Sequence, residues 1–333
     1  MESMKIKNIS CAIVLFACLA NAGYAQSKVG TSAAQFLGIS VGPKALAMGS
    51  AYVAASNDVT SLYWNPGGFV QANKTEFQFS NTNWLVDTKF RWFGFMYNLD
   101  GQNAFGVSLT QLDYGEEDVT TVDQPEGTGE RWSAQDLAVG ISYSRRFTDR
   151  FSLGGTVKFL NQRVWNETAD GITFDLGLLF ITEFNNIRIG MSMSNFGGDL
   201  QLDGHDLLVE VSGSNNSAKL KTDAWPTPLF FRIGLSMDAI RTNDMNATVA
   251  IDWLRPNDNA ATLNLGGELG WRDMLFIRSG YKSIGLENSQ EGFSFGGGIK
   301  YTASGVGSLE VDYSFNRFGA FDNLNTIGVS IAF

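Results

Sequence analysis

The sequence predicts an all-β protein, a membrane-spanning β-barrel of about 14 antiparallel strands with an N-terminal segment folded into its lumen. Three observations predict this class. An export signal opens the chain, apolar and polar residues alternate with period two through most of the remaining sequence, and short connections alternate with long ones. No later run of about 18 apolar residues predicts a transmembrane helix.

The first 25 residues have the composition of a secretory signal peptide. A short positive region precedes the apolar stretch "ISCAIVLFACLANA", and "GYA" supplies small residues for cleavage. We expect residues 1–25 to be removed; cleavage after Ala22 and a lipoprotein site at Cys18 are the alternatives. Because Cys11 and Cys18 are the two cysteines of the chain, we expect no disulfide, no thiol chemistry and no cysteine-based metal site in the exported protein. No cofactor is expected.

Composition excludes one class of partner and favours strands. The chain has 34 acidic and 24 basic residues, a net charge of −10. Nucleic acid is therefore not an expected partner, because binding it depends on lysine and arginine neutralising phosphates. The content of 37 glycines and 13% aromatic residues, with 17% charged residues, is typical of strands with polar but uncharged faces.

Residues 26–74 do not alternate and form the predicted plug. "TSAAQFLGIS" could make a short amphipathic helix, and "WNPGG" predicts a chain reversal. There Pro66 would fix φ, and Gly67 and Gly68 would be free to take positive φ. A segment of this kind before the first strand is expected to fold into the lumen.

Residues 75–333 form the predicted barrel. Phe105, Val107 and Leu109, for example, interleave with small or polar residues. We expect strands centred near residues 79, 94, 109, 141, 158, 177, 191, 233, 249, 266, 278, 297, 312 and 329. Connections after even-numbered strands are short, such as "DGQN" and "FTDR", whereas long loops are expected at about 114–134, 196–226 and 282–291. This is the pattern of bacterial outer-membrane barrels.

In such a barrel the apolar set faces lipid and the polar set faces the lumen. Charged residues fall on the polar set at Asp175, Arg232, Asp252, Glu268, Lys300, Glu310 and Asp312. A soluble barrel would bear a large desolvation cost for these charges if they were unpaired, whereas a wet or plugged lumen can hold them. Tryptophans near strand ends are expected in interfacial girdles: Trp92, Trp132, Trp165, Trp253 and Trp271.

The chain ends in "TIGVSIAF", which we interpret as the last strand, pairing with the first. Thr326, Gly328, Ile331 and the terminal Phe333 resemble the C-terminal signal that bacterial outer-membrane assembly machinery recognises. An ordinary buried strand is the alternative. Outer-membrane lipid and the assembly machinery are therefore expected partners, and the bacterial outer membrane is the expected location.

The sequence gives little support for catalysis or for metal binding. His205 is the one histidine, so paired-histidine metal motifs are excluded. It lies in a long loop without a serine placed beside it, so we expect no enzyme. Asp199, Asp203 and Asp206 could supply oxygen ligands to Ca²⁺, but their spacing matches no EF-hand and favours a polar hairpin. The acidic loop beginning at Tyr114 is either solvated or a docking surface for a cationic partner.

The N-terminal segment resembles a known family. Ala45, Met48-Gly49, Ala51-Tyr52, Asn57-Asp58 and Tyr63-Trp64-Asn65-Pro66, with Gly68, are similar to the N-terminal hatch of the long-chain fatty-acid transporter (FadL) family. The stretch "GTSAAQFLGISVGPKALAMG" is most similar to the PorV/PorQ branch, whose members are tied to type IX secretion. Lys44 and Gly67 depart from the family pattern, which has arginine and alanine there.

The resemblance implies a fourteen-stranded barrel with a luminal hatch. The hatch residues it implies are Met48, Asn57, Asp58, Tyr63, Trp64, Asn65, Pro66 and Gly68. For PorV-like relatives it implies binding of translocon partners or secreted clients, which we expect through loops 114–134 and 196–226. For transporter relatives it implies carriage of small hydrophobic compounds. The resemblance favours the first function, and the second is the alternative.

Overall fold

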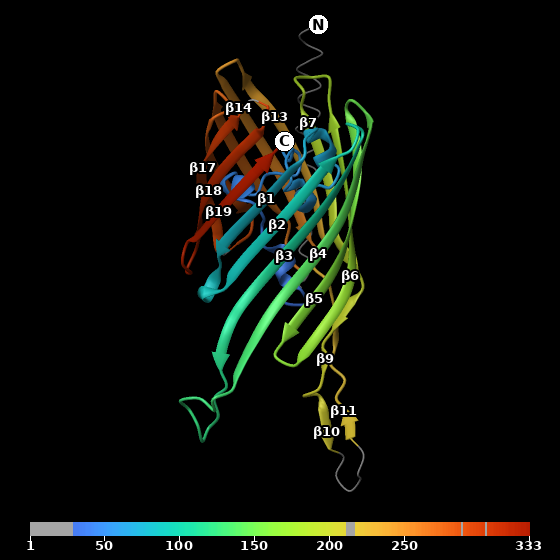
Figure 1. Ribbon diagram of the computed structural model, residues 1–333, viewed down its shortest axis with the longest axis vertical. Coiled ribbons are helices and arrows are strands. Elements are labelled where there is room, and N and C mark those ends of the chain that lie inside the picture. The colour runs from blue at the N-terminus through green and yellow to red at the C-terminus, as the bar shows by residue number, and fades with distance from the viewer. Residues whose placement is uncertain (1–28, 211–216, 288, 304) are drawn as a thin grey trace.

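The computed structural model describes residues 29–210, 217–287, 289–303 and 305–333. In these residues the chain forms a closed antiparallel barrel of fourteen strands (Figure 1). The predicted signal peptide, residues 1–25, lies outside the described residues. Across the described part of the chain, every helix is too short or too polar to span a bilayer.

Each predicted strand centre falls within an observed strand. The barrel strands are β1 (Glu76–Asn83), β2 (Lys89–Asn98), β3 (Asn103–Asp118), β4 (Arg131–Thr148), β5 (Phe151–Val164), β6 (Glu167–Ile181), β7 (Arg188–Gly197), β13 (Phe230–Arg241), β14 (Met245–Pro256), β15 (Thr262–Trp271), β16 (Leu275–Ile284), β17 (Glu291–Ala303), β18 (Gly307–Phe318) and β19 (Leu324–Ala332). The predicted strand number and class are confirmed.

The first and last strands close the barrel. β1 pairs antiparallel with β19, with Phe79 opposite Val329 and Thr82 opposite Thr326. Backbone hydrogen bonds in both directions between Thr75 and Phe333 extend this pairing to the end of the chain. Closure gives each barrel strand a neighbour on both sides, so the barrel proper has no open sheet edge to leave backbone groups unpaired in lipid.

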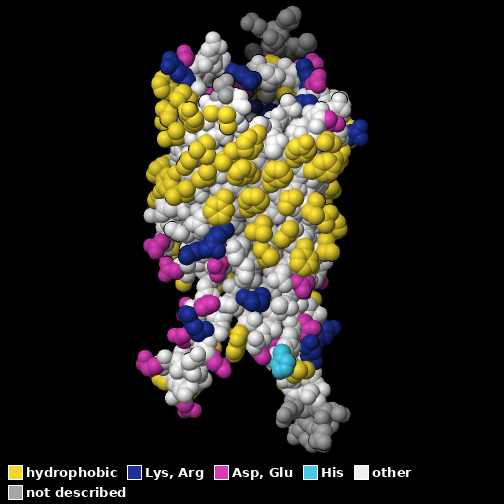
Figure 2. Space-filling view, in the orientation of Figure 1, with side chains coloured by type: hydrophobic (Ala, Val, Ile, Leu, Met, Phe, Trp, Pro, Cys, Tyr) yellow, Lys and Arg dark blue, Asp and Glu magenta, His cyan; other side chains and the backbone are white. Residues whose placement is uncertain are grey.

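The two faces of the wall have the polarity of a membrane barrel. Outward residues such as Phe105, Val107 and Leu109 are exposed, while Ser108 and Thr110, the inward residues that alternate with them, are buried. Figure 2 shows the result as a belt of hydrophobic side chains across the middle of the face in view, with charged side chains gathered above and below it.

One of the predicted girdle tryptophans faces the other way. Trp92 is 1% exposed and points into the barrel. The outward set of β2 is Phe93, Phe95 and Tyr97, so period two turns Trp92 inward. The prediction for Trp92 was wrong because it considered only that Trp92 lies near the end of a strand. It ignored that the alternation along β2 turns this position inward. Trp132, Trp165 and Trp271 are exposed, and Trp253 is partly exposed.

The long connections gather at one end of the barrel. The loops between β3 and β4, between β7 and β13, and between β16 and β17 run over 119–130, 198–229 and 285–290. The first two lie at the lower end in Figure 1, where the strands β3 to β6 extend furthest. The second loop carries short strands of its own: β8 (Asp199–Gln201), β9 (Asp203–Gly204), β10 (Leu208–Glu210), β11 (Ser217–Lys219) and β12 (Ala224–Pro226).

The residues before β1, here called the N-terminal segment (29–74), contain no strand. Their helical turns are η1 (Gln35–Gly38), α2 (Pro43–Ala47), α3 (Ser61–Trp64) and η2 (Phe69–Ala72), and a further turn, η3 (Leu85–Asp87), follows β1. Ser294 of β17 donates to the carbonyl of Ala47, and Leu62 packs beside Gly106 of β3. The N-terminal segment therefore contacts the inner faces of strands from both halves of the barrel.

Candidate functional site: the N-terminal segment and the long-loop end

An apolar cluster joins the N-terminal segment to the wall made by β2 to β6. From the N-terminal segment come Phe36, Leu37, Leu62 and Phe69; from the wall come Phe90, Trp92, Met96, Leu112 and Leu160. Leu160 and Phe69 are at most 1% exposed. Leu200, from the long loop after β7, closes the same cluster over Gly171. The interior beside these strands is thus filled by side chains packed against one another.

The "WNPGG" stretch lies directly against the backbone of β5 and β6. The amide of Asn65 donates to the carbonyls of Val53 and Leu178, both at 2.9 Å. The carbonyl of Pro66 lies against Gly154. A Cβ on Gly67 would lie 2.7 Å from the carbonyl oxygen of Gly177. This side of the wall therefore accepts the N-terminal segment only because glycines line the contact.

The glycines of "WNPGG" serve a different purpose from the one predicted. Gly68 has a φ of −85°, and neither Gly67 nor Gly68 is among the residues with positive φ. The expectation of positive φ was wrong. A Cβ on Gly68 would meet the carbonyl oxygen of Ser56 at 2.8 Å. Close approach to neighbouring backbone, rather than a left-handed turn, explains both glycines and the departure from alanine at Gly67.

A buried carboxylate on another part of the wall binds the backbone of the N-terminal segment. Asp252 of β14 accepts hydrogen bonds from the N–H groups of Tyr52 and Val53, at 2.6 and 2.8 Å. Trp64 donates its indole N–H to the carbonyl of Val41 at 2.9 Å and packs edge-on against Tyr63. The N-terminal segment is therefore tied to the wall through its backbone as well as through its side chains.

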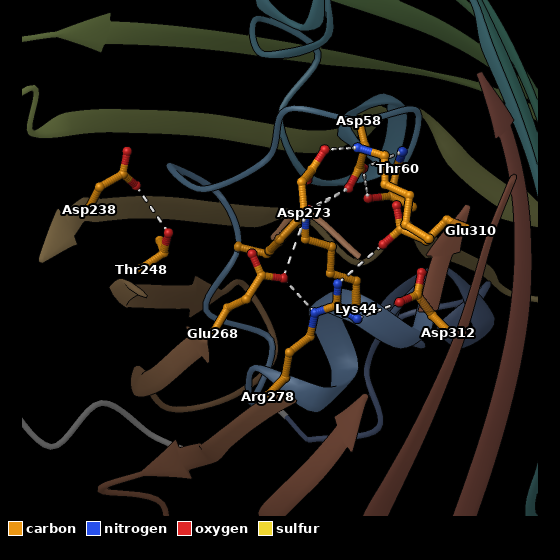
Figure 3. A network of polar contacts seen from close by, with 12 residues as sticks. Lys44, Asp58, Thr60, Asp238, Thr248, Glu268, Asp273, Arg278, Glu310 and Asp312 are labelled. Carbon is orange, nitrogen blue, oxygen red and sulfur yellow. Dashed lines mark hydrogen bonds and ion pairs between the residues drawn. The ribbon is translucent and has the colours of Figure 1, made fainter. Parts of the chain in front are cut away.

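A charged cluster, Lys44, Asp58, Glu268, Arg278, Glu310 and Asp312, connects α2 to β15, β16 and β18 (Figure 3). Lys44 lies 3.9 Å from Asp58 and 3.8 Å from Glu268. Arg278, whose side chain is fully buried, pairs with Glu268 at 2.5 Å, with Glu310 at 3.3 Å, and with Asp312. Removing one partner of such a cluster would leave an uncompensated buried charge, at a cost of about 3–5 kcal/mol.

Both ionisable members from the N-terminal segment keep their charges. Burial disfavours the ammonium of Lys44, but the carboxylates of Glu268 and Asp58 outweigh it and raise the pKa of Lys44. Burial likewise disfavours the carboxylate of Asp58, but Lys44 and hydrogen bonds from Thr60 and Tyr52 lower its pKa. The contact between the N-terminal segment and the wall is therefore ionic here.

Two small cavities lie beside this cluster and are polar. One of about 130 Å³ is lined by Met48, Tyr52 and Asn57 of the N-terminal segment together with charged residues of β7, β13 and β15. The other, of about 170 Å³, also reaches Lys44, Asn57 and Glu268. Each could hold a few water molecules. Their linings offer no apolar surface of the size that a hydrocarbon ligand requires.

The structure brings most of the predicted hatch residues together. Trp64, Asn65, Pro66 and Gly68 form one contact with the wall, and Tyr63 donates its hydroxyl to the carbonyl of Leu37. Asp58 belongs to the charged cluster, while Met48 and Asn57 line the cavities beside it. Two separate contact areas are thus formed by residues that lie within a short stretch of sequence.

Sequence reasoning missed two residues. Arg278 was not singled out, although it lies between the outward Ile277 and Ser279 in a strand whose parity turns it inward. The second is Leu200, 2% exposed, in a loop expected to be external. No sequence signal separates it from its exposed neighbours.

The C-terminal residues alternate as the strand predicts. Thr326 faces inward and shares a hydrogen bond of 2.7 Å with Thr82. Gly328 also faces inward, against Pro43, whereas Ile331 is partly exposed and Phe333 is 65% exposed. Whether assembly machinery recognises these residues stays a prediction.

At the long-loop end the two predicted loops differ in how firmly they are held. Residues 114–134 contain six acidic residues and one basic residue, Arg131, which pairs with Glu116 and Asp118. In the other loop, β9 pairs with β6 and β12 with β8.

The residues considered for catalysis and metal binding lie in this second loop. His205 is 85% exposed, Asp203 pairs with Lys219, and Asp206 accepts a hydrogen bond from Asn166. Among the described residues, no three acidic, histidine or cysteine side chains gather to hold a metal.

Comparison with known proteins agrees with the sequence-based resemblance. Residues 22–178 match the family model described as type IX secretion system protein PorV. The resemblance to the PorV family is confirmed. The PorV match spans the N-terminal segment, the acidic loop and the wall from β1 into β6, just under half of the chain. No curated protein matches this chain.

Solved structures share the fold. The CymD monoaromatic hydrocarbon channel superposes with a TM-score of 0.58 at 14% identity, over 88% of this chain and 96% of that one. The Pseudomonas putida toluene transporter TodX gives 0.54 at 14%, over 88% and 97%. The Ralstonia pickettii toluene transporter TbuX gives 0.52 at 16%, over 88% and 97%. At these identities the likeness concerns the fold alone; with the PorV match, it identifies a bacterial outer-membrane barrel.

Proposed function

We propose that the protein is a non-enzymatic barrel that binds protein partners or clients in a type IX secretion and surface-attachment pathway. The observation that carries the proposal is the filling of the interior by the N-terminal segment. Its apolar side chains are buried against β2 to β6, and the two cavities beside its other side are polar. A carrier of hydrophobic molecules needs an apolar pocket, and a partner-binding barrel does not.

In this proposal the N-terminal segment is a plug. It is held by an apolar cluster on one side of the lumen, by the carboxylate of Asp252 on another, and by the ion pairs of Lys44. Contacts on several sides oppose displacement in any one direction. The plug then keeps the lumen closed to ions while the barrel acts through its surface.

The partner surface is the long-loop end. In outer-membrane barrels short turns face the periplasm and long loops face outward. Residues 114–134 and the described part of the loop 198–229 project there, and Val122 in the first loop is 99% exposed. Together the two loops could supply the roughly 800 Å² per partner that an ordinary interface buries. The excess of carboxylates in the first loop favours a partner surface that carries lysine or arginine.

The alternative is a transporter of small hydrophobic compounds. The likeness of fold to the CymD, TodX and TbuX structures favours it. Transport would require the N-terminal segment to move, because its apolar residues leave the inner face of β2 to β6 without an open apolar path.

Site-specific photo-crosslinking in cells tests the proposal. A photoreactive amino acid replaces Val122 at the long-loop end or, as the matched control, Val306, a 71% exposed valine in a short turn. We expect a protein adduct from position 122 and none from position 306. Absence of an adduct at 122, with adducts confined to 306, would contradict a partner surface on the long-loop end.

A further inference from the structure

A groove on the outer wall combines an apolar lining with an arginine at one end. It has a volume of about 720 Å³ and crosses β4, β5, β6, β7 and β13. Its lining is mostly apolar, with Leu153, Leu176, Met191, Met193 and Phe231 along its length. Arg145 stands at one end.

The groove follows from the strand register. Two rows of outward residues run across the strands side by side. One row is Arg145, Leu153, Leu178 and Met191; the other is Tyr143, Gly155, Leu176, Met193 and Phe231. Gly155 has no side chain, so a gap remains between Tyr143 and Leu176. An added Cβ there would meet the carbonyl oxygen of Asp175 at 3.4 Å and a methyl group of Leu176 at 3.6 Å, both ordinary contacts, so a side chain larger than a methyl group would fill the groove at this point.

The length and direction of the groove fit one acyl chain. Five adjacent strands span four inter-strand spacings, about 19 Å. One leaflet of the hydrocarbon core is about 15 Å thick. The groove starts near the short-turn end of β4, three residues before Thr148, and finishes beside the long loop at the start of β13. It therefore rises from the periplasmic interface into the bilayer.

The charge at its end fits a phosphate. Arg145 is exposed, its guanidinium lies 5.5 Å from the ring of Phe147, and it makes no ion pair with any described residue within 4.0 Å. Arginine binds phosphate through paired N–H groups and extends readily to the interface from an outward position. Tyr143 beside it is held by a hydrogen bond to Asn103.

We propose that this groove is a binding site for one phospholipid of the periplasmic leaflet, with an acyl chain over Gly155 and the phosphate on Arg145. The site is separate from the proposed partner surface, because it lies on the lipid-facing wall and its Arg145 end points toward the short turns. It depends on two features that can be altered separately, the gap and the cation.

Native mass spectrometry of the detergent-purified full chain tests the site. The probes are dioleoyl phosphatidylglycerol, dioleoylglycerol without phosphate, and free glycerol 3-phosphate. We expect one phosphatidylglycerol bound, and weaker binding of the other two. Arg145→Gln and Gly155→Leu should each reduce phosphatidylglycerol binding about tenfold, by removing a charge-assisted contact or filling the gap.

The matched controls lie outside the groove, on β15 and at the turn that follows it. Gly267→Leu adds the same side chain on an outward position of β15, and Arg272→Gln removes an exposed arginine at a turn. Both should bind phosphatidylglycerol as the unmodified chain does. Binding unaffected by Arg145→Gln, an exposed change that leaves the packing intact, would overturn the proposal. So would equal binding of dioleoylglycerol.

Discussion

At the scale of single residues, the N-terminal segment is seated by backbone contacts that admit no side chain. Gly67 lies against the backbone of β6 at Gly177 and Leu178, and Pro66 lies against Gly154 of β5. Strand backbone cannot shift without breaking ladder hydrogen bonds on either side. A Cβ at position 67 therefore has to be accommodated by displacing the N-terminal segment itself.

We expect Gly67→Val to unseat the N-terminal segment while the barrel folds. The valine would overlap the Gly177 carbonyl, so the lumen should open and ions should pass through the protein in planar bilayers. Gly267→Val, outward on β15, should stay closed. A chain lacking residues 29–74 gives the conductance of the open lumen for comparison. Steady conductance of that size from the unmodified chain would contradict a plug.

Local sequence rules identified the right stretch for this contact but gave the wrong reason for its two glycines. Pro66 followed by two glycines predicts a turn, because nearest neighbours are all that such a rule considers. The approach of Gly67 to β6 depends on residues more than a hundred positions away. The same holds for Lys44 and Glu268, whose ion pair no spacing in the sequence could reveal.

At the scale of elements, strands were predictable because period two is a local property. Each strand's two faces meet different surroundings, lipid outside and the N-terminal segment inside. Trp92 shows the limit of residue type as a guide. A tryptophan near a strand end suggested the membrane interface, whereas the alternation along β2 places Trp92 inside the barrel. Leu200 shows a second limit of local sequence rules. This loop residue is buried only because the loop folds over Gly171.

The last strand leads to a prediction on assembly. Phe333 is exposed on the lipid side, and its backbone already pairs with Thr75. Phe333→Asp should therefore leave the hydrogen-bonded ladder possible but reduce the amount of heat-modifiable barrel in membranes several-fold, because a terminal carboxylate replaces the aromatic of the assembly signal. Asn325→Asp, also exposed on β19, serves as the control. Normal barrel levels for Phe333→Asp would contradict the signal.

At the scale of the whole molecule, the two ends of the barrel differ in the length of the connections between strands. Short turns join the strands at one end. At the other end, β3 and β4 carry one long loop and β7 and β13 carry the other (Figures 1 and 2). Between the two ends, the N-terminal segment packs against the inner faces of the strands. A barrel built in this way presents surface rather than a passage, which is the central claim of the proposed function.

Shortening the loops tests the role of the long-loop surface independently of the barrel interior. The backbone bonds between Val119 and Glu130 and between Leu207 and Leu220 allow residues 120–129 and 208–219 to be replaced by tight turns. These cuts spare Leu200 and the strands β8, β9 and β12, which pack on the barrel. Thermal stability should change little. Trp64→Ala serves as the interior counterpart, because Trp64 is buried within the N-terminal segment.

The most direct measurement is the protein and lipid content of the complex purified from outer membranes in detergent, determined by mass spectrometry for the unmodified chain, the double loop variant and Trp64→Ala. We expect a protein partner with the unmodified chain and with Trp64→Ala, and its loss from the double loop variant. Retention of every protein by the loop variant, together with loss of a bound lipid or hydrocarbon from Trp64→Ala, would contradict the account and favour a carrier.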